Sequence, residues 1–221
     1  MSLGARTILD REYAGIRDDL LRLSELVDSA IEQAMNALKS VDTELARQII
    51  QNDMQVNNLR FKIEENSMRL LATQQPAARD LRAIVAVLHL VAELERIGDH
   101  AAGIAKTVTL MEKAPPPKTL KKLTTMADLS RQMMKDSMQA FLQRDAEWAR
   151  QIALEDPLMD ELYKEVFDRI VKVMAKHPEL IKRGTYIMWC AHNLERIADR
   201  VTNIAERVVY MVTGEMRELN M

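Results

Sequence analysis

The chain has 221 residues, a formal net charge of −2 and 48% hydrophobic residues, which is enough to bury one large core or two small ones. Only six glycines and six prolines are present, too few for a sandwich or barrel with many turns. The near-neutral charge argues against nucleic acid as a partner, because nucleic-acid binding usually requires a concentrated basic surface.

The lone cysteine, Cys190, excludes an intrachain disulfide and fits a reducing compartment. The N-terminus carries no apolar signal segment, and the longest apolar run, around 83–92, is far shorter than the roughly 20 residues that span a bilayer. We therefore expect any contact with a membrane to be peripheral, at the surface or through a membrane-bound partner.

Six long helices are predicted, and helices of this length with short connections lie antiparallel to their neighbours. In chain order they cover about 10–40, 42–73, 76–113, 119–143, 145–176 and 178–213. Asp42 fits the N-cap of the second helix, Pro76 opens the third, and Gly214 ends the sixth. Three consecutive prolines predict a linker over 114–118, because proline blocks helix and favours extended geometry.

The sequence also repeats itself. The segment Ala46–Ile49 returns as Ala149–Ile152, an offset of 103, and the motif at 95–105 returns at 195–205, an offset of 100. Such self-similarity marks an internal duplication. The predicted fold is therefore all-α, with two pseudo-symmetric three-helix bundles. The first unit covers 1–113, the proline-rich linker 114–118 and the second unit 119–221.

Both copies of the repeated motif carry two acids four residues apart, which places them on one face of a helix. The second helix of each half carries a matching step, with Asp156 and Asp160 in one half and Asp53 and Asn57 in the other. If the second and third helices pack side by side, each half assembles four oxygen-bearing side chains. The candidate metal ligands are Asp53, Asn57, Glu95 and Asp99 in the first half and Asp156, Asp160, Glu195 and Asp199 in the second.

Such oxygen ligands suit hard cations such as Mg²⁺, Ca²⁺, Mn²⁺ or iron, and the spacing typical of a structural zinc site is missing. Asn57 is neutral, so the first set is the weaker of the two. The alternative is that the acids are solvated and bind nothing.

Catalytic residues are not predicted. The sequence shows no Glu-x-x-His pair, glycine-rich phosphate loop or nucleophile elbow. A metal-dependent carboxylate-cluster enzyme, either an oxidase or a phosphohydrolase, is the alternative function, and it depends on the acids alone.

Three stretches together resemble the PhoU family of phosphate-signalling regulators. They are Glu-Arg-Ile-Gly-Asp-His-Ala at 95–101, Asn-Leu-Glu-Arg-Ile-Ala-Asp at 193–199 and Gln-Pro-Ala-Ala-Arg-Asp-Leu-Arg at 75–82. The third stretch has no second copy of its Asp-Leu-Arg step, so the two halves are expected to be unequal.

The resemblance implies two three-helix bundles and acidic motifs that bind iron or zinc clusters in some members; manganese and magnesium suit the same oxygen ligands. It implies a non-enzymatic, cytoplasmic adaptor between a phosphate ABC transporter and a sensor histidine kinase, which keeps the phosphate-starvation response off when phosphate is plentiful. It also implies a homodimer. An accessory protein of a different phosphate transporter is a further alternative.

Overall fold

The computed structural model describes residues 3–215, with side chains from Arg6 onward, and within these residues the chain is helical without strands. The predicted all-α class is therefore confirmed. The elements are α1 (Leu3–Ser40), α2 (Thr43–Gln74), α3 (Ala78–Val108), α4 (Pro117–Gln143), α5 (Ala146–Ala153), α6 (Asp156–Lys176), the short 3₁₀ turn η1 (Pro178–Leu180) and α7 (Ile181–Thr213).

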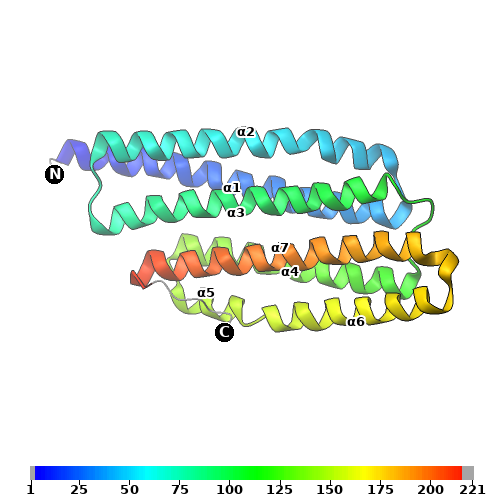
Figure 1. The fold of residues 1–221 in the computed structure, drawn as a ribbon. Helices are drawn as coiled ribbons and strands as arrows, with labels where there is room; N and C mark the ends of the chain where they lie inside the picture. Colours follow the sequence, from blue (N-terminus) through cyan, green and yellow to red (C-terminus); the bar gives the residue numbers. More distant parts are fainter. Residues whose placement is uncertain (1–2, 216–221) are drawn as a thin grey trace.

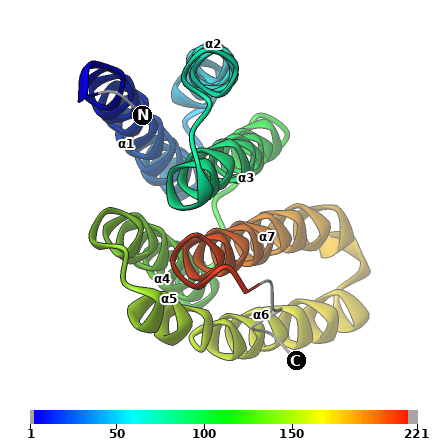
Figure 2. The same cartoon turned by 90° about the vertical axis from the view of Figure 1, so that its left-hand side faces the viewer.

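The helices form two three-helix bundles, as predicted (Figure 1). Helices α1, α2 and α3 pack together in the first bundle, while α4, α7 and the pair α5 and α6 form the second. Viewed along the helices, α3 and α7 lie side by side where the bundles meet, and α1 also contacts α4 (Figure 2). One continuous apolar core of aliphatic and methionine side chains runs through both bundles.

The duplication is visible in how the helices begin. The carboxylate of Asp42 accepts hydrogen bonds from the backbone N–H groups of Glu44 and Leu45, at 3.1 and 2.9 Å. Asp145, 103 residues later, caps α5 in the same way, at 3.0 and 2.9 Å. Each cap satisfies backbone donors that lack partners within the helix. Gly214 ends α7 in the left-handed region, with φ of 81°, as predicted.

The predicted single helix over 145–176 is wrong. It breaks after Ala153, and α6 starts at Asp156. Pro157 explains the break, because proline has no backbone N–H and its ring clashes with the preceding turn, so it is tolerated only in the first turn of a helix.

Other predicted boundaries shift by a few residues. Helix α3 ends at Val108, five residues before the predicted end, and α4 begins at Pro117, so the last two residues of the predicted 114–118 linker are helical. Helix α1 starts at Leu3, α3 starts two residues after Pro76, and 178–180 forms the turn η1 ahead of α7. Residues 1–2 and 216–221 of the predicted units lie outside the described residues. None of the helices described here has an apolar stretch long enough to cross a membrane.

Candidate functional site

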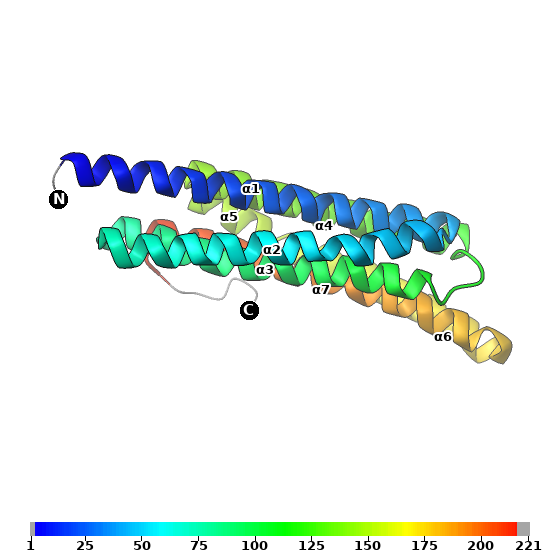
Figure 3. The same cartoon turned by 90° about the horizontal axis from the view of Figure 1, so that it is seen from above.

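Helix packing brings the predicted acids of each half toward one another. Helix α2 packs along α3, and α6 packs along α7, which meets the condition set in the sequence analysis (Figure 3). In the first half Asp53 lies within electrostatic reach of Asp99, and in the second half Asp156 lies within reach of both Asp160 and Asp199. Each half therefore carries one acidic cluster, the first cluster between α2 and α3 and the second cluster between α6 and α7.

The first cluster contains a cation that the sequence analysis missed. Arg60 donates from Nη1 to Glu95 Oε1 at 2.7 Å and from Nε to Glu64 Oε1 at 2.9 Å. The Glu95 side chain is only 16% exposed, so this ion pair is partly shielded from water. Arg60 follows Asp53 by seven residues, on the same face of α2, and that spacing was the available signal.

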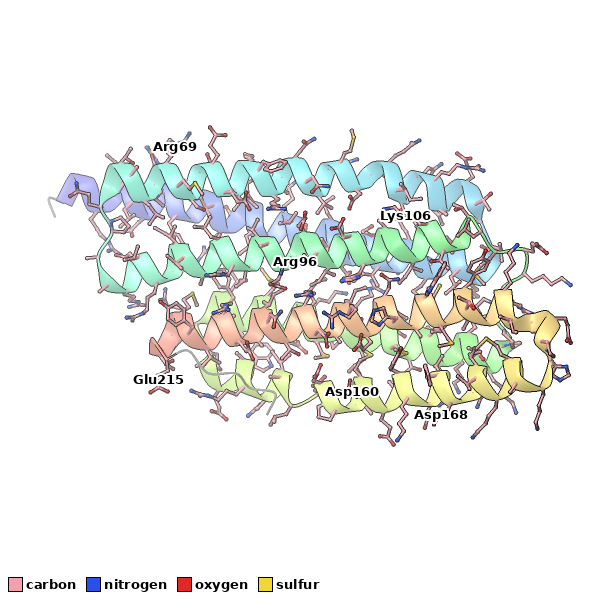
Figure 4. All side chains as sticks on the ribbon, viewed as in Figure 1. Arg69, Arg96, Lys106, Asp160, Asp168 and Glu215 are labelled. Atoms are coloured by element: carbon pink, nitrogen blue, oxygen red, sulfur yellow. The ribbon has the colours of Figure 1, made fainter. Side chains whose placement is uncertain are left out.

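Asp53 and Asn57 also bind each other. Asn57 donates from Nδ2 to the Asp53 carboxylate and to its backbone carbonyl, both at 3.2 Å. Burial, together with the nearby Asp99, raises the pKa of Asp53, while Lys106 and the Asn57 hydrogen bond act in the opposite direction. Lys106 and Arg96, both on α3, are labelled in Figure 4. In the first cluster, Glu95 therefore has an ion pair with Arg60 and Asp53 has a hydrogen bond from the Asn57 side-chain amide.

A glycine lets the helices approach closely at this point. A Cβ on Gly98 would lie 3.3 Å from Cγ1 of Val56 and 3.6 Å from the Asp53 carboxylate. The equivalent residue in the second half is Ala198, so the second cluster carries a methyl group where the first has none.

The second cluster lacks the equivalent of Arg60, because Tyr163 occupies that position. Its carboxylates are held differently. Arg196 donates to Asp199 at 2.6 Å, and the Thr202 hydroxyl donates to Asp156 at 3.4 Å. Asp160 lies on α6, where Figure 4 labels it. The second cluster therefore has four carboxylates, and the arginine ion pair within it is made to Asp199 and not to the glutamate.

Glu195 is the least satisfied member of the second cluster. Its Oε2 is buried and makes no hydrogen bond, and the nearest cation-forming atom is Nδ1 of His192 at 3.4 Å. Burial and the charge of Asp199 raise the pKa of Glu195, against the opposing effect of Arg196. Burial likewise raises the pKa values of Asp156 and Asp199. Buried carboxylate oxygens without partners are costly, and a cation would relieve that cost.

Neither cluster is a preformed metal site. Within residues that the structure describes, no three His, Cys, Asp or Glu side chains converge closely enough to hold an ion. The second cluster fits a hard cation by its ligand chemistry, provided that Asp199 turns from Arg196 toward Glu195. The first cluster fits poorly, because Arg60 already neutralises Glu95.

A second polar arrangement, also missed from sequence, joins the two bundles. Glu93 of α3 accepts from Asn203 at 3.2 Å and pairs with Arg200 at 3.5 Å, both on α7. One hundred residues after Glu93, Asn193 of α7 makes the reciprocal contact, to Nδ1 of His100 on α3 at 3.0 Å. These contacts fix the register of α3 against α7 and thus the distance between the acidic clusters.

We expect the partly buried acids of the two clusters to add stability to the chelator-treated protein as the pH falls into their titration range, while two partly buried histidines, whose pKa values burial lowers, act against this gain. A carboxyl group whose pKa is higher in the folded than in the unfolded state binds more protons when folded, so stability falls as pH rises through that window. Asp53, Asp156, Glu195 and Asp199 all shift in this direction. Glu195→Gln should raise the free energy of unfolding at pH 7 and flatten its pH dependence, as measured by urea unfolding.

The control for this prediction is Glu161→Gln, at an exposed glutamate of α6. If the free energy of unfolding of Glu195→Gln depends on pH in the same way as that of the wild type, burial does not raise the pKa of Glu195 and the prediction is wrong.

Two copies of one helical unit, joined along α3 and α7 and carrying an acidic cluster at the same helix pair, define a duplicated helical-bundle protein with acidic motifs. The chain belongs to the PhoU family, since the model of the PhoU domain matches residues 20–108 and again residues 123–208. The two matched segments correspond to the two bundles.

Two relatives match along almost their whole length. A "Phosphate-specific transport system accessory protein PhoU homolog" from Clostridium acetobutylicum is 32% identical over 97% of this chain and 99% of its own length. A protein of the same description from Streptococcus pneumoniae is 36% identical over 97% of this chain and its entire length. The solved structure of the phosphate transport system regulatory protein PhoU from S. pneumoniae superimposes with a TM-score of 0.88, at 35% identity, over 95% of this chain and 99% of that chain. PhoU from Pseudomonas aeruginosa gives the same TM-score and identity over 93% and 99%.

Proposed function

We propose that this chain is a cytoplasmic accessory protein of phosphate transport that keeps the phosphate-starvation response off. It acts without catalysis, as an adaptor between a phosphate ABC transporter and a sensor histidine kinase, and reaches the membrane only through these partners. The proposal includes a homodimer. The observation that carries it is the end-to-end match, in sequence and in both bundles, to proteins described as accessory or regulatory components of phosphate transport.

We further propose that the second acidic cluster holds a metal ion, with iron, zinc, manganese and magnesium as the candidates. Asp156, Asp160, Glu195 and Asp199 would hold it. Its charge would offset the repulsion among these carboxylates and cross-link α6 to α7. The Oε2 atom of Glu195, which is buried without a hydrogen bond, and the all-oxygen ligand set support this proposal.

Regulation is tested with a reporter of a phosphate-starvation promoter in a strain of the source organism that lacks this chain. The reporter is expected to be on in high phosphate, off again when the chain is supplied, and off in a strain that also lacks the kinase. A reporter that stays off without the chain contradicts the proposal. If phosphate uptake alone changes, an accessory role at a different phosphate transporter is favoured instead.

Metal-dependent turnover is the competing function. It would be favoured by oxidase or phosphatase activity of the manganese- or iron-loaded protein that is lost in Glu195→Ala/Asp199→Ala while regulation in the reporter strain persists.

A further inference from the structure

Four arginines from three helices gather at one end of the molecule, where the two bundles meet. They are Arg17 on α1, Arg79 and Arg82 in the first two turns of α3, and Arg144 at the C-cap of α4. Helix α1 packs against both α3 and α4, and the start of α3 and the ends of α4 and α7 lie at this end of the molecule (Figure 2). These four residues are the arginine cluster.

The side chains of the arginine cluster converge near Tyr13, a half-buried residue of α1. Both Arg17 and Arg144 lie within electrostatic reach of the Tyr13 hydroxyl. Arg144 in turn lies within reach of Arg79 and Arg82, and burial together with these two charges lowers the pKa of Arg144 against the opposite effect of two acidic groups. Like charges held together in a partly buried place are unfavourable unless an opposite charge joins them.

The chain supplies little negative charge to the arginine cluster. Within the part of the chain that the structure describes, none of the four arginines forms a salt bridge, and the Nε atoms of Arg17 and Arg82 are buried without a hydrogen bond. The two carboxylates that adjoin the cluster in sequence are engaged elsewhere, since Asp80 pairs with Arg6 at 2.5 Å and Asp145 caps α5. Buried N–H donors without acceptors are costly, so the arrangement favours an external anion.

The start of α3 adds further donors to this place. Its N-cap residue, Ala77, makes no side-chain hydrogen bond to the first backbone N–H groups of the helix. A helix N-terminus carries a partial positive charge, so Arg79 in the first turn is unfavourable there and an anion is favourable. Arg82, one turn further on, reaches toward the second bundle, because its Nη1 lies 3.6 Å from the position that a Cβ on Gly214 would take.

The duplicated fold does not require arginine at these positions. At the repeat offset of 103, the residue equivalent to Arg144 is Val41 and the residue equivalent to Arg17 is Leu120. Both Arg144 and Val41 have left-handed backbone, with φ of 57° and 55°, so the fold sets this turn whichever side chain it carries. The Asp-Leu-Arg step that contains Arg82 has no second copy either. The positive charge is therefore specific to this end of the molecule.

We propose that the arginine cluster binds a phosphate group, either free inorganic phosphate or the phosphoryl group of a larger molecule. Planar guanidinium groups donate paired hydrogen bonds to phosphate oxygens, and a helix N-terminus binds the same ligand through its backbone N–H groups. The Tyr13 hydroxyl is a further donor, because burial raises its pKa and keeps it protonated at neutral pH. The inference goes beyond the proposed function, since the site shares no residue with the acidic clusters and requires neither a metal nor a partner protein.

Isothermal titration calorimetry of the chelator-treated full chain tests the proposal, with inorganic phosphate and pyrophosphate as the probes. The wild type is expected to bind at one saturable site, and the tighter of the two probes shows whether the free ion or a linked phosphoryl group is the better ligand. Arg82→Gln and Arg144→Gln should each weaken binding by about ten- to a hundredfold, because each removes charge-assisted hydrogen bonds. Arg82→Lys should also weaken binding, since lysine keeps the charge and loses the planar fork.

Two controls separate the arginine cluster from other charged parts of the chain. Arg169 lines a surface pocket together with Lys172 and Lys176, so Arg169→Gln removes a positive charge from a different basic place and should bind phosphate like the wild type. Glu195→Ala/Asp199→Ala should also bind like the wild type, because the proposed site does not use the second acidic cluster.

Chemical protection of the wild type gives a readout that does not depend on the folding of any variant. Phenylglyoxal modifies guanidinium groups, and peptide mass spectrometry measures the modification of each arginine. The probe that binds should slow the modification of Arg79, Arg82 and Arg144 and leave that of Arg169 unchanged. Far-ultraviolet circular dichroism and thermal melts confirm that the variants are folded. Without phosphate, Arg82→Gln should melt no lower than the wild type, because it relieves repulsion among the arginines.

Three results would overturn the proposal. The first is a wild type that binds neither phosphate nor pyrophosphate, and the second is equal weakening of binding in Arg82→Gln and Arg169→Gln. The third is loss of binding in Glu195→Ala/Asp199→Ala with unchanged binding in the arginine variants, which would place phosphate at the second acidic cluster. None of these results bears on the regulatory proposal, which the reporter assay decides separately.

Discussion

Arg60→Ala is expected to lower the free energy of unfolding by about 2–4 kcal/mol at pH 7, because it leaves partly buried carboxylates without their cation. Arg60 holds Glu95 at 2.7 Å and Glu64 at 2.9 Å, and no described residue other than Arg60 forms a salt bridge with either carboxylate. Urea unfolding followed by circular dichroism measures the change.

The control is Arg47→Ala, which removes the exposed pair between Arg47 and Glu44 on the same helix. Exposed pairs contribute little, so its effect should stay within about 0.5 kcal/mol. An Arg60→Ala variant no less stable than Arg47→Ala would show that the first cluster does not depend on this arginine. Arg60→Tyr places in the first half the residue that the second half has at this position, Tyr163. This variant should bind Mn²⁺ at the first cluster more tightly than the wild type does.

The second large effect is expected on metal addition. A ligand that binds only the folded state stabilises it by about 2.7 kcal/mol at one hundred times its Kd. For a chain of this size that corresponds to a rise in Tm of about 5–10 °C. Chelator-treated wild type should show this rise with the metal it binds, in a series of Mn²⁺, Zn²⁺, Mg²⁺ and, without oxygen, Fe²⁺.

Glu195→Ala/Asp199→Ala should abolish that rise, and without metal it should be as stable as the wild type or more stable, because it relieves repulsion between buried carboxylates. Glu95→Ala/Asp99→Ala is the matched control in the first half and should keep the rise. The same rise in all three proteins would mean that the stabilising metal binds elsewhere.

The helix pattern and the duplication were predictable from the sequence because they repeat over long distances. The apolar period fixed which faces are buried, and the recurring Asp42 and Asp145 caps fixed where two helices begin. The break before Pro157 was missed because the equivalent segment of the first half, α2, was expected to be one continuous helix and the second half was predicted to match it. A single proline interrupts the helix in the second half despite the duplication.

The acidic residues of the candidate site could be predicted from the sequence, but the arginines that pair with them could not. Both copies retain the acid pair, and the packing of α2 on α3 and of α6 on α7 follows from short connections. Arg60 escaped prediction because its equivalent is Tyr163, so a search for residues shared by both halves discards it. The pairing of Arg196 with Asp199 depends on side-chain rotamers, which periodicity does not specify.

The asymmetry between halves therefore has a simple physical origin. Duplication supplied two similar acidic faces, and the residue at one position, Arg60 on α2 or Tyr163 on α6, decides whether the repeated glutamate, Glu95 or Glu195, has an arginine partner on the neighbouring helix. In the first half Arg60 supplies the positive charge, while in the second half the tyrosine at that position leaves the buried Oε2 of Glu195 without a hydrogen bond.

The measurement that tests this account most directly is metal content by elemental mass spectrometry on untagged protein, purified without chelator. We expect stoichiometric metal in the wild type, retained in Glu95→Ala/Asp99→Ala and lost in Glu195→Ala/Asp199→Ala. Metal absent from all three, or lost equally from both variants, would contradict the assignment of a cation site to the second cluster.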